Sequence, residues 1–276
     1  MVNTVEARQR SRRLRKYTVI YKATLMENLQ YVFNIVLGFV SYFMLLFIFI
    51  SLWDYMYSDS SARIAGYTKE QMMWYVLITE MLWFGTRTRT VTRQVSNDIR
   101  QGNIAYQINK PYHYTLYVLA KYTGEWSVRL PVYAILSIVM GITMVGWLPG
   151  ISIYNIPFII ISVILGITID AVLRMCVSLI AFWIEDAAPF QWLYDKLILV
   201  VGTIFPIEIF PKVLQGIFKY TPIYVVTYGP AKLIVDFSMD ACVRIFTAQI
   251  IYLAVGFVVM FTVYAKGVRK LNVYGG

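Results

Sequence analysis

Two long uncharged apolar runs constrain the fold of this chain more than any other feature of its sequence. The first extends from Ile35 to Trp53 and the second from Ile245 to Tyr264, and neither contains an acidic or basic residue. A bilayer core about 30 Å thick needs roughly 20 helical residues, so each run is long enough to cross it. The composition, 59% hydrophobic and 14% charged, is also far from that of soluble domains. We therefore predict an all-α membrane protein.

Further apolar segments between these two runs bring the expected number of transmembrane helices to six. Some of them contain ionisable residues, such as Glu80, but each is apolar over most of its length. The expected spans are at about residues 33–55, 71–88, 117–147, 156–184, 190–210 and 243–265. No linker separates a soluble region from these segments, so residues 1–276 are expected to form a single membrane domain.

Basic residues indicate how the chain is oriented in the membrane. Lys and Arg are concentrated before the first span, between the second and third spans, and in the tail. Because positive loops stay on the cytoplasmic side, we expect both termini there. The arm over residues 1–30 is amphipathic, with Tyr17, Tyr21 and Leu25 four residues apart, so it should lie on the membrane surface and contact anionic lipid. It either anchors the chain there or also contacts a cytosolic partner.

Two segments outside the spans carry helical signals of their own. Val91, Val95 and Ile99 recur every fourth residue before Gly102, which predicts a short amphipathic helix on the cytoplasmic side. Such a helix is either an inert connector or a docking element, and the pattern favours neither. Residues 205–240 contain four prolines between short apolar pieces, which predicts a re-entrant or interfacial helical pair outside the cell before the last span.

Ionisable residues within the expected spans need partners, because an isolated charge is costly in a bilayer. Glu125 and Arg129 are four residues apart, as are Asp170 and Arg174, so each pair is expected to meet on one helical face as a structural ion pair. Glu80 has no such neighbour. We expect it to bond to another helix or a second copy of the chain, or else to take part in transport.

The residues that most catalytic sites need are missing from the sequence. It contains no Gly-x-x-x-x-Gly-Lys-Ser/Thr motif, and His113 is its single histidine. Cys176 and Cys242 are far apart in the sequence and suit neither a disulfide framework nor a metal cluster. The charged residues are also too few for a nucleic-acid-binding domain. We expect a protein that is not an enzyme by itself, with no catalytic residue, metal, cofactor or nucleic acid.

Three stretches resemble the six-span membrane subunits of bacterial ABC-2 type exporters. IRQGNIAYQINKP, from Ile99 to Pro111, is similar to the inner loop of that family, and SLIAFWIEDA, from Ser178 to Ala187, to the end of its fourth span. FPIEIFPKVLQGIFKYTPIYVVTYGPAKLI, from Phe205 to Ile234, is similar to the region before its last span. The resemblance implies an ATP-driven exporter subunit in the bacterial cytoplasmic membrane, paired with an identical or homologous six-span subunit and two cytosolic ATPase subunits that bind ATP and Mg²⁺.

The resemblance also implies roles for particular segments. The helix near Val91 becomes a coupling helix that contacts the ATPase, and the N-terminal arm becomes a connecting helix beside it. The coupling residues are Val91, Val95, Asp98, Ile99, Arg100, Gln101, Gly102 and Ile104. The connecting-helix residues are Arg12, Arg13, Arg15, Tyr17 and Tyr21.

In that family the cargo pathway runs between two membrane subunits, beside the second and fifth spans. The candidates for lining it are Trp74, Leu77, Glu80, Met81, Phe84, Leu197, Val201 and Phe205. Such a lining suits an amphiphilic or hydrophobic compound, such as a drug, a peptide or a lipid-like molecule. Two other functions stay open: an ion-coupled secondary transporter, and a membrane anchor or receptor that transports nothing.

Overall fold

The computed structural model describes residues 2–30, 32–57, 63–87, 90–148, 150–184 and 186–274, and helices make up most of this part of the chain. The long helices are α1 (Val2–Gln30), α2 (Val32–Met56), α3 (Lys69–Thr86), α6 (Tyr114–Met144), α7 (Ile156–Ser178), α8 (Ala188–Val200) and α11 (Met239–Tyr274). The short ones are η1 (Thr90–Gln94), α4 (Val95–Arg100), α5 (Asn103–Ile108), η2 (Ile153–Asn155), η3 (Leu179–Phe182), η4 (Ile207–Ile209), α9 (Lys212–Lys219), η5 (Tyr224–Tyr228) and α10 (Gly229–Val235).

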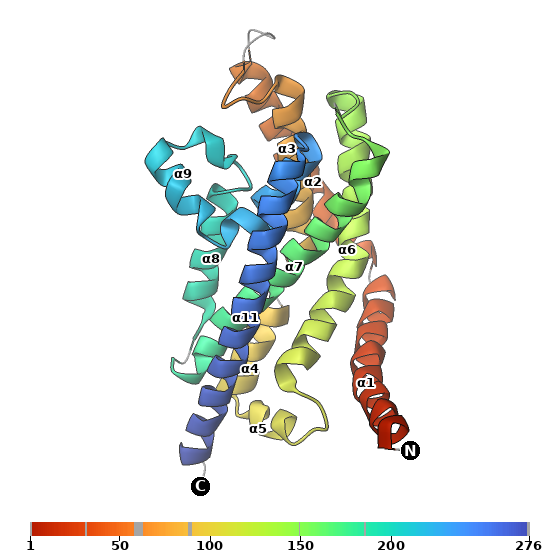
Figure 1. Ribbon diagram of the computed structural model, residues 1–276, viewed down its shortest axis with the longest axis vertical. Coiled ribbons are helices and arrows are strands. Elements are labelled where there is room, and N and C mark those ends of the chain that lie inside the picture. The colour runs from red at the N-terminus through yellow and green to blue at the C-terminus, as the bar shows by residue number, and fades with distance from the viewer. Residues whose placement is uncertain are drawn as a thin grey trace.

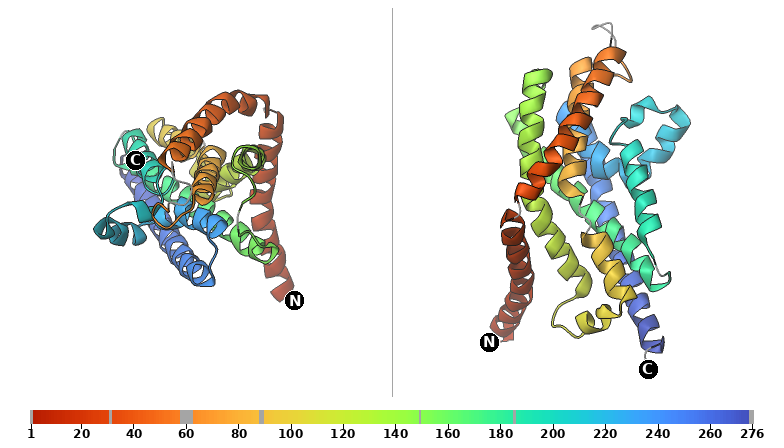
Figure 2. Two further views of the ribbon diagram at one scale, coloured as in Figure 1. Left: turned by 90° about the horizontal axis from the view of Figure 1, so that it is seen from above. Right: turned by 180° about the vertical axis from the view of Figure 1, so that it is seen from behind.

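The long helices run along one axis, and both chain ends lie at the same end of the molecule (Figure 1). The segment containing α4 and α5 lies at this terminal end, whereas α9 lies towards the opposite end (Figure 1). Helix α3 is near the centre of the bundle when the molecule is viewed along its length (Figure 2). Nearly every side chain from Met72 to Thr86 is buried, because α2, α6 and α10 pack around it.

Four helices of the described chain are long and apolar enough to cross a membrane: Gly38–Met56, Tyr114–Met144, Ile153–Phe182 and Met239–Lys270. They correspond to the first, third, fourth and sixth expected spans. The second expected span is α3, which contains Lys69, Glu70 and Glu80 within its 18 residues. The protein is therefore an all-helical integral membrane protein, as predicted.

The segment expected to form the fifth span differs from the prediction. Helix α8 has 13 residues and ends at Val200, whereas the apolar pattern predicted a helix as far as residue 210. A turn follows, with Gly202 at φ +98° and a bridge between Val201 and Phe205. Pro206 comes directly after this turn and cannot donate a helical hydrogen bond. Hydrophobicity alone did not reveal the turn, because its residues are as apolar as those of the helix.

Residues 205–240 fold into short helical pieces, η4, α9, η5 and α10, which are connected at the prolines. Helix α9 projects from the bundle, whereas η5 and α10 pack on α7 (Figure 1). The contact with α7 is close at Gly166, where a Cβ atom would lie 2.7 Å from the carbonyl oxygen of Val226. The piece that carries α10 is therefore part of the core, and α9 is the one that lies on the surface.

Candidate functional site

The segment between α3 and α6 carries the residues that the sequence marked for coupling. Val91, Val95, Ile99 and Ile104 are all buried within the chain. Their apolar stripe faces η3 and the adjoining end of α7. The family resemblance includes this stripe among the coupling residues, and in the described structure it packs against its own chain. An amphipathic helix only needs its apolar side covered, and here α7 and η3 cover it.

The opposite side of this segment is exposed. It presents what we call the α4–α5 surface: Arg93, Asn97, Arg100, Gln101, Gly102 and Tyr106. Gly102, at φ +75°, ends α4 and lets the chain turn into α5. Tyr106 is 69% exposed, and Lys110 Nζ lies 4.5 Å from the centre of its ring. The groups that a partner can contact are thus the polar and aromatic side chains that alternate in the sequence with the buried stripe.

Asp98 has a structural partner instead of an exposed position. Its Oδ2 atom accepts a hydrogen bond of 2.7 Å from the hydroxyl of Tyr114, the first residue of α6. The hydrogen bond fixes the distance between α4 and the start of α6. Asp98 is therefore placed to orient the α4–α5 surface.

A buried ion network lies directly behind η1. Arg174 donates from Nε to Asp170 at 2.8 Å and from Nη1 to Asp195 at 2.5 Å. Tyr194 donates to the other oxygen of Asp170 at 2.8 Å. The pair expected from the four-residue spacing is therefore present as part of a larger group, which we call the Arg174 network: Asp170, Arg174, Tyr194 and Asp195.

Hydrogen bonds connect the Arg174 network to the segment that carries the α4–α5 surface. Ser178, one turn beyond Arg174, donates to the carbonyl oxygen of Val91 at 3.3 Å. Gln191 of α8 donates to Ser178 Oγ at 2.9 Å and to the carbonyl oxygen of Arg174 at 2.7 Å. Tyr122 of α6 donates to the carbonyl oxygen of Thr86 at 3.1 Å. The Tyr122 hydroxyl also lies 3.4 Å from Asp170 Oδ2, and α6, α7 and α8 contact η1, so these helices and the end of α3 meet beside the Arg174 network.

Sequence reasoning did not assign Tyr122, Gln191 or Asp195 to this site. Asp195 gave a signal, because it is an ionisable residue in an apolar segment and such residues need partners. Tyr122 and Gln191 gave no specific signal, because an uncharged polar side chain near the end of a membrane helix can face lipid headgroups or any neighbouring helix. Their roles follow from the crossing of α6 and α8 with α7, which pattern analysis of one helix at a time does not reveal.

The second expected ion pair has a different geometry. Arg129 donates from Nη1 to the carbonyl oxygen of Arg87 at 3.0 Å, which connects α6 to the end of α3. No ion pair between Arg129 and Glu125 occurs in the described structure, although Glu125 is buried on the same helix. The last carbonyl groups of a helix lack intrahelical partners, which explains why they attract this guanidinium.

The N-terminal helix α1 packs along α6 at the terminal end (Figure 1). Gly124 of α6 permits this contact, since a Cβ atom there would lie 2.9 Å from the carbonyl oxygen of Tyr21. The Tyr17 hydroxyl accepts a hydrogen bond from the backbone N–H of His113 at 3.0 Å, and Lys16 donates to the carbonyl oxygen of Pro111. Arg15 is exposed, and the side chains of Arg12 and Arg13 lie outside the described residues.

The expected pathway residues on α3 are not gathered around one passage. Trp74 and Met81 line an apolar pocket of about 360 Å³ between α3, α6 and α7. Leu77 is fully buried elsewhere on α3, and the Phe84 ring is 5.0 Å from that of Tyr42. Glu80 is also fully buried, and its two carboxylate oxygens have no hydrogen-bond partner among the described residues.

The expected pathway residues beyond α3 also separate. Val201 and Phe205 lie in the turn after α8, which is attached to α3 by hydrogen bonds from Tyr75 to Gly202 O (2.6 Å) and from Thr79 to Thr203 O (2.8 Å). Leu197 is exposed on the surface of α8. Within one chain, therefore, this set forms a packed contact on one side of α3 and an open surface on α8.

Comparison with protein families shows which family the chain belongs to. A family model described as ABC-2 family transporter protein matches residues 39–275, which include the α4–α5 surface and the Arg174 network. The chain belongs to this family. No curated protein matches it. As an ABC-2 family member, it is a membrane-embedded subunit of a transport system. Such subunits associate with ABC ATPases and are in general not catalytic themselves.

Proposed function

We propose that this protein is the membrane subunit of an ATP-driven exporter in the bacterial cytoplasmic membrane. It pairs with a like subunit, identical or homologous, and couples to two cytosolic ATPase subunits, which bind ATP and Mg²⁺. Both termini and the α4–α5 surface are on the cytoplasmic side. The observation that supports this function is the Arg174 network, because it connects the segment behind that surface to α7 and α8, and Tyr122 joins α6 and the end of α3 to it.

The network gives the α4–α5 surface a mechanical role. The buried stripe of Val91, Val95 and Ile99 fixes the surface to α7 and η3, so the segment moves together with these helices. When the ATPases close, their displacement of the surface reaches the terminal ends of α3, α6, α7 and α8 together. Close-packed interiors transmit such a shift instead of absorbing it. Helix α1, attached to α6 through Tyr17, provides a second contact.

We propose that α3 and α8 complete six crossings. Helix α3 is surrounded by other helices, so Glu80 in its interior does not face lipid, and a span of this kind can be less apolar than one on the outside. The turn after α8 extends the fifth crossing, because its carbonyl groups accept hydrogen bonds from Tyr75 and Thr79. Backbone that is not helical is tolerated at membrane depth where protein covers it.

The cargo that fits is amphiphilic or hydrophobic. The pocket beside Trp74 and Met81 is lined by apolar side chains, and burial of apolar surface favours binding by about 25 cal/mol per Å². We place the passage between two copies of the chain, beside α3 and α8. Glu80 is fully buried within one chain, so it acts on cationic cargo when α3 opens towards this passage during transport, and the Glu80→Gln variant should then reduce export of cationic compounds more than that of neutral ones. Equal losses would remove this role.

The coupling role is tested by reconstituting the subunit with its ATPase and measuring cargo-stimulated ATP hydrolysis and export. Arg100→Glu reverses a charge at the centre of the α4–α5 surface and should lower coupled export about tenfold or more, since charges at an interface set its register. Arg63→Glu, an exposed arginine outside this surface, serves as the matched control and should have no effect. Unchanged export by Arg100→Glu, or sustained uphill transport in vesicles without nucleotide, would overturn the proposal.

A further inference from the structure

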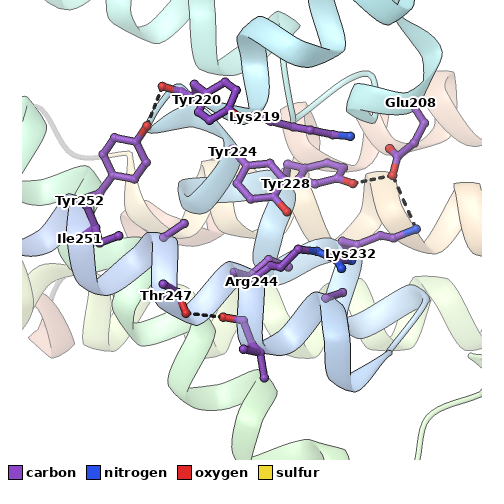
Figure 3. Close-up of a pocket in the computed structure, with 14 residues that line it drawn as sticks. Glu208, Lys219, Tyr220, Tyr224, Tyr228, Lys232, Arg244, Thr247, Ile251 and Tyr252 are labelled. Atoms are coloured by element: carbon purple, nitrogen blue, oxygen red, sulfur yellow. Dashed lines mark hydrogen bonds and ion pairs between the residues drawn. The ribbon is translucent and has the colours of Figure 1, made fainter.

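A second pocket, of about 820 Å³, lies between α9, η5, α10 and the first half of α11 (Figure 3). It is separate from the α4–α5 surface and from the apolar pocket beside α3. Four tyrosines and four charged residues line it, and the charged ones are Glu208, Lys219, Lys232 and Arg244. Basic residues outnumber acidic ones among them, and tyrosine is the most frequent residue type.

One of the basic residues is already neutralised by the protein. Lys232 Nζ lies 3.6 Å from Glu208 Oε1 and 2.7 Å from Asp236 Oδ2. The Tyr228 hydroxyl donates to the same oxygen of Glu208, so this carboxylate is held against the wall of the pocket (Figure 3). Glu208, Asp236 and Lys232 therefore form a group with one more carboxylate than cation, so Lys232 offers no positive charge to a ligand.

Lys219 and Arg244 are different. In the described part of the chain neither forms an ion pair with a carboxylate, and both are exposed to the pocket (Figure 3). The Tyr224 hydroxyl points to the side of the pocket on which Arg244 lies (Figure 3). Two cations and a phenol that line one pocket provide donors for the oxygen atoms of a phosphate, because charge-assisted hydrogen bonds from Arg and Lys are the strongest contacts to that group.

The surroundings of the pocket are those of a membrane surface. Val243 and Ile251, on the same turns of α11 as Arg244 and Thr247, are exposed and continue into the apolar surface of the last span. Helix α9 exposes Val213 and Ile217 beside the pocket. Tyr252 donates to the carbonyl oxygen of Tyr220 at 2.6 Å and connects α11 to the end of α9. A ligand with a phosphate in the pocket would lay an acyl chain along α11.

We propose that this pocket binds the anionic headgroup of a phosphate-bearing lipid, in the leaflet at the end of the molecule remote from both termini. Lys219, Arg244 and the Tyr224 hydroxyl contact the phosphate, and the exposed side of α11 contacts the acyl chain. The lipid fixes α9 against α11 and thereby orders the segment before the last span. The proposal does not depend on the ATPase, so it stands or falls separately from the coupling role.

The test uses the full chain in nanodiscs or detergent and measures, by native mass spectrometry, how much phosphatidylglycerol it retains relative to phosphatidylcholine. The intact protein should retain the anionic lipid preferentially. Replacing both cations, Lys219→Gln with Arg244→Gln, should reduce that preference about tenfold, because each basic residue adds to attraction at a charged membrane surface. Arg244→Lys keeps the charge and should keep most of the preference. Lys212→Gln changes an exposed lysine on α9 outside the pocket and should have no effect.

Three results would overturn the proposal. The first is equal retention of the two lipids by the intact protein. The second is an equal loss in the Lys212→Gln control and the double variant, which would indicate a diffuse surface effect. The third is displacement of the lipid by millimolar glycerol phosphate or inorganic phosphate, because a soluble anion has no acyl chain and would show that the pocket serves a free phosphate instead. Circular dichroism of the double variant confirms that its helices are retained.

Discussion

Two short amphipathic segments at opposite ends of the molecule differ in whether their apolar side chains are buried or exposed. In η1 and α4, Val91 and Val95 are 0% exposed and Ile99 is 8% exposed. In α9, Val213 is 77% exposed and Ile217 is 56% exposed. Both segments show apolar residues at helical spacing, yet one stripe is covered by the chain itself and the other faces outwards. The sequence pattern therefore shows that a helix has an apolar side, but it does not show what covers that side.

The connections on either side of each segment explain the difference. The η1–α4 segment lies between α3 and α6, which hold it against α7, and Ser178 bonds to its backbone. Helix α9 follows Pro211, and the described chain leaves its outer side open. A membrane can cover that side, because lipid tails are as apolar as a protein core. The terminal end is therefore closed by protein, and the α9 end depends on its lipid surroundings.

The largest effect is expected where the closed end is held together. Arg174→Met removes the cation between Asp170 and Asp195 and leaves the buried Asp170 carboxylate and the partly exposed Asp195 carboxylate without compensation, which should lower the free energy of unfolding by about 3 kcal/mol. Thermal unfolding in detergent, followed by tryptophan fluorescence, measures the loss. Lys196→Met, an exposed cation on α8, should change stability by less than about 0.5 kcal/mol. Equal effects would mean that the network does not hold this end together.

A smaller and more direct comparison uses the same substitution at both ends. Ile99→Ala removes a buried side chain and should cost about 2–4 kcal/mol, because the surrounding residues relax only partly into the space. Ile217→Ala, on the exposed side of α9, should cost less than about 0.5 kcal/mol. The same thermal unfolding measurement on both variants compares the two stability losses. A larger loss for Ile217→Ala would show that a protein surface, and not lipid, covers α9.

The smallest effect concerns pH at the closed end. His113 lies between the rings of Phe261 and Tyr264, with centroid distances of 5.2 and 4.8 Å, and burial lowers its pKa from the ordinary value of 6.5. The unfolded chain then takes up a proton before the folded one. Stability is therefore complete above pH 6.5 and falls as the pH drops towards the lowered pKa.

This pH dependence is measured as the difference between the intact protein and His113→Gln. Melting temperatures are compared from about pH 7.5 to about pH 5.5, where histidine titrates. The intact protein should lose slightly more stability than the variant over this range. If the two curves run parallel, the imidazole is solvated in the folded state and this end is more open than the structure indicates.

The sequence alone determined the membrane class, the helical fold and the family. Uncharged runs such as Ile35–Trp53 permit little else, because a bilayer offers no water to unpaired backbone groups. The four-residue spacing of Asp170 and Arg174 also predicted their contact, since spacing within one helix fixes which residues share a face. These inferences are local, and local geometry follows from the order of residues.

Only the tertiary structure decided which side of each element is covered and by what. In the folded chain, Val95 and Ile99 are buried, and Asp195 of α8 forms an ion pair with Arg174 of α7. Arg129 donates a hydrogen bond to the end of α3 and, in the described structure, does not form an ion pair with Glu125. It also ended α8 at Val200 and opened a basic pocket beside Arg244. Each of these outcomes depends on how helices far apart in the sequence cross, and helical periodicity carries no information about the crossing partner.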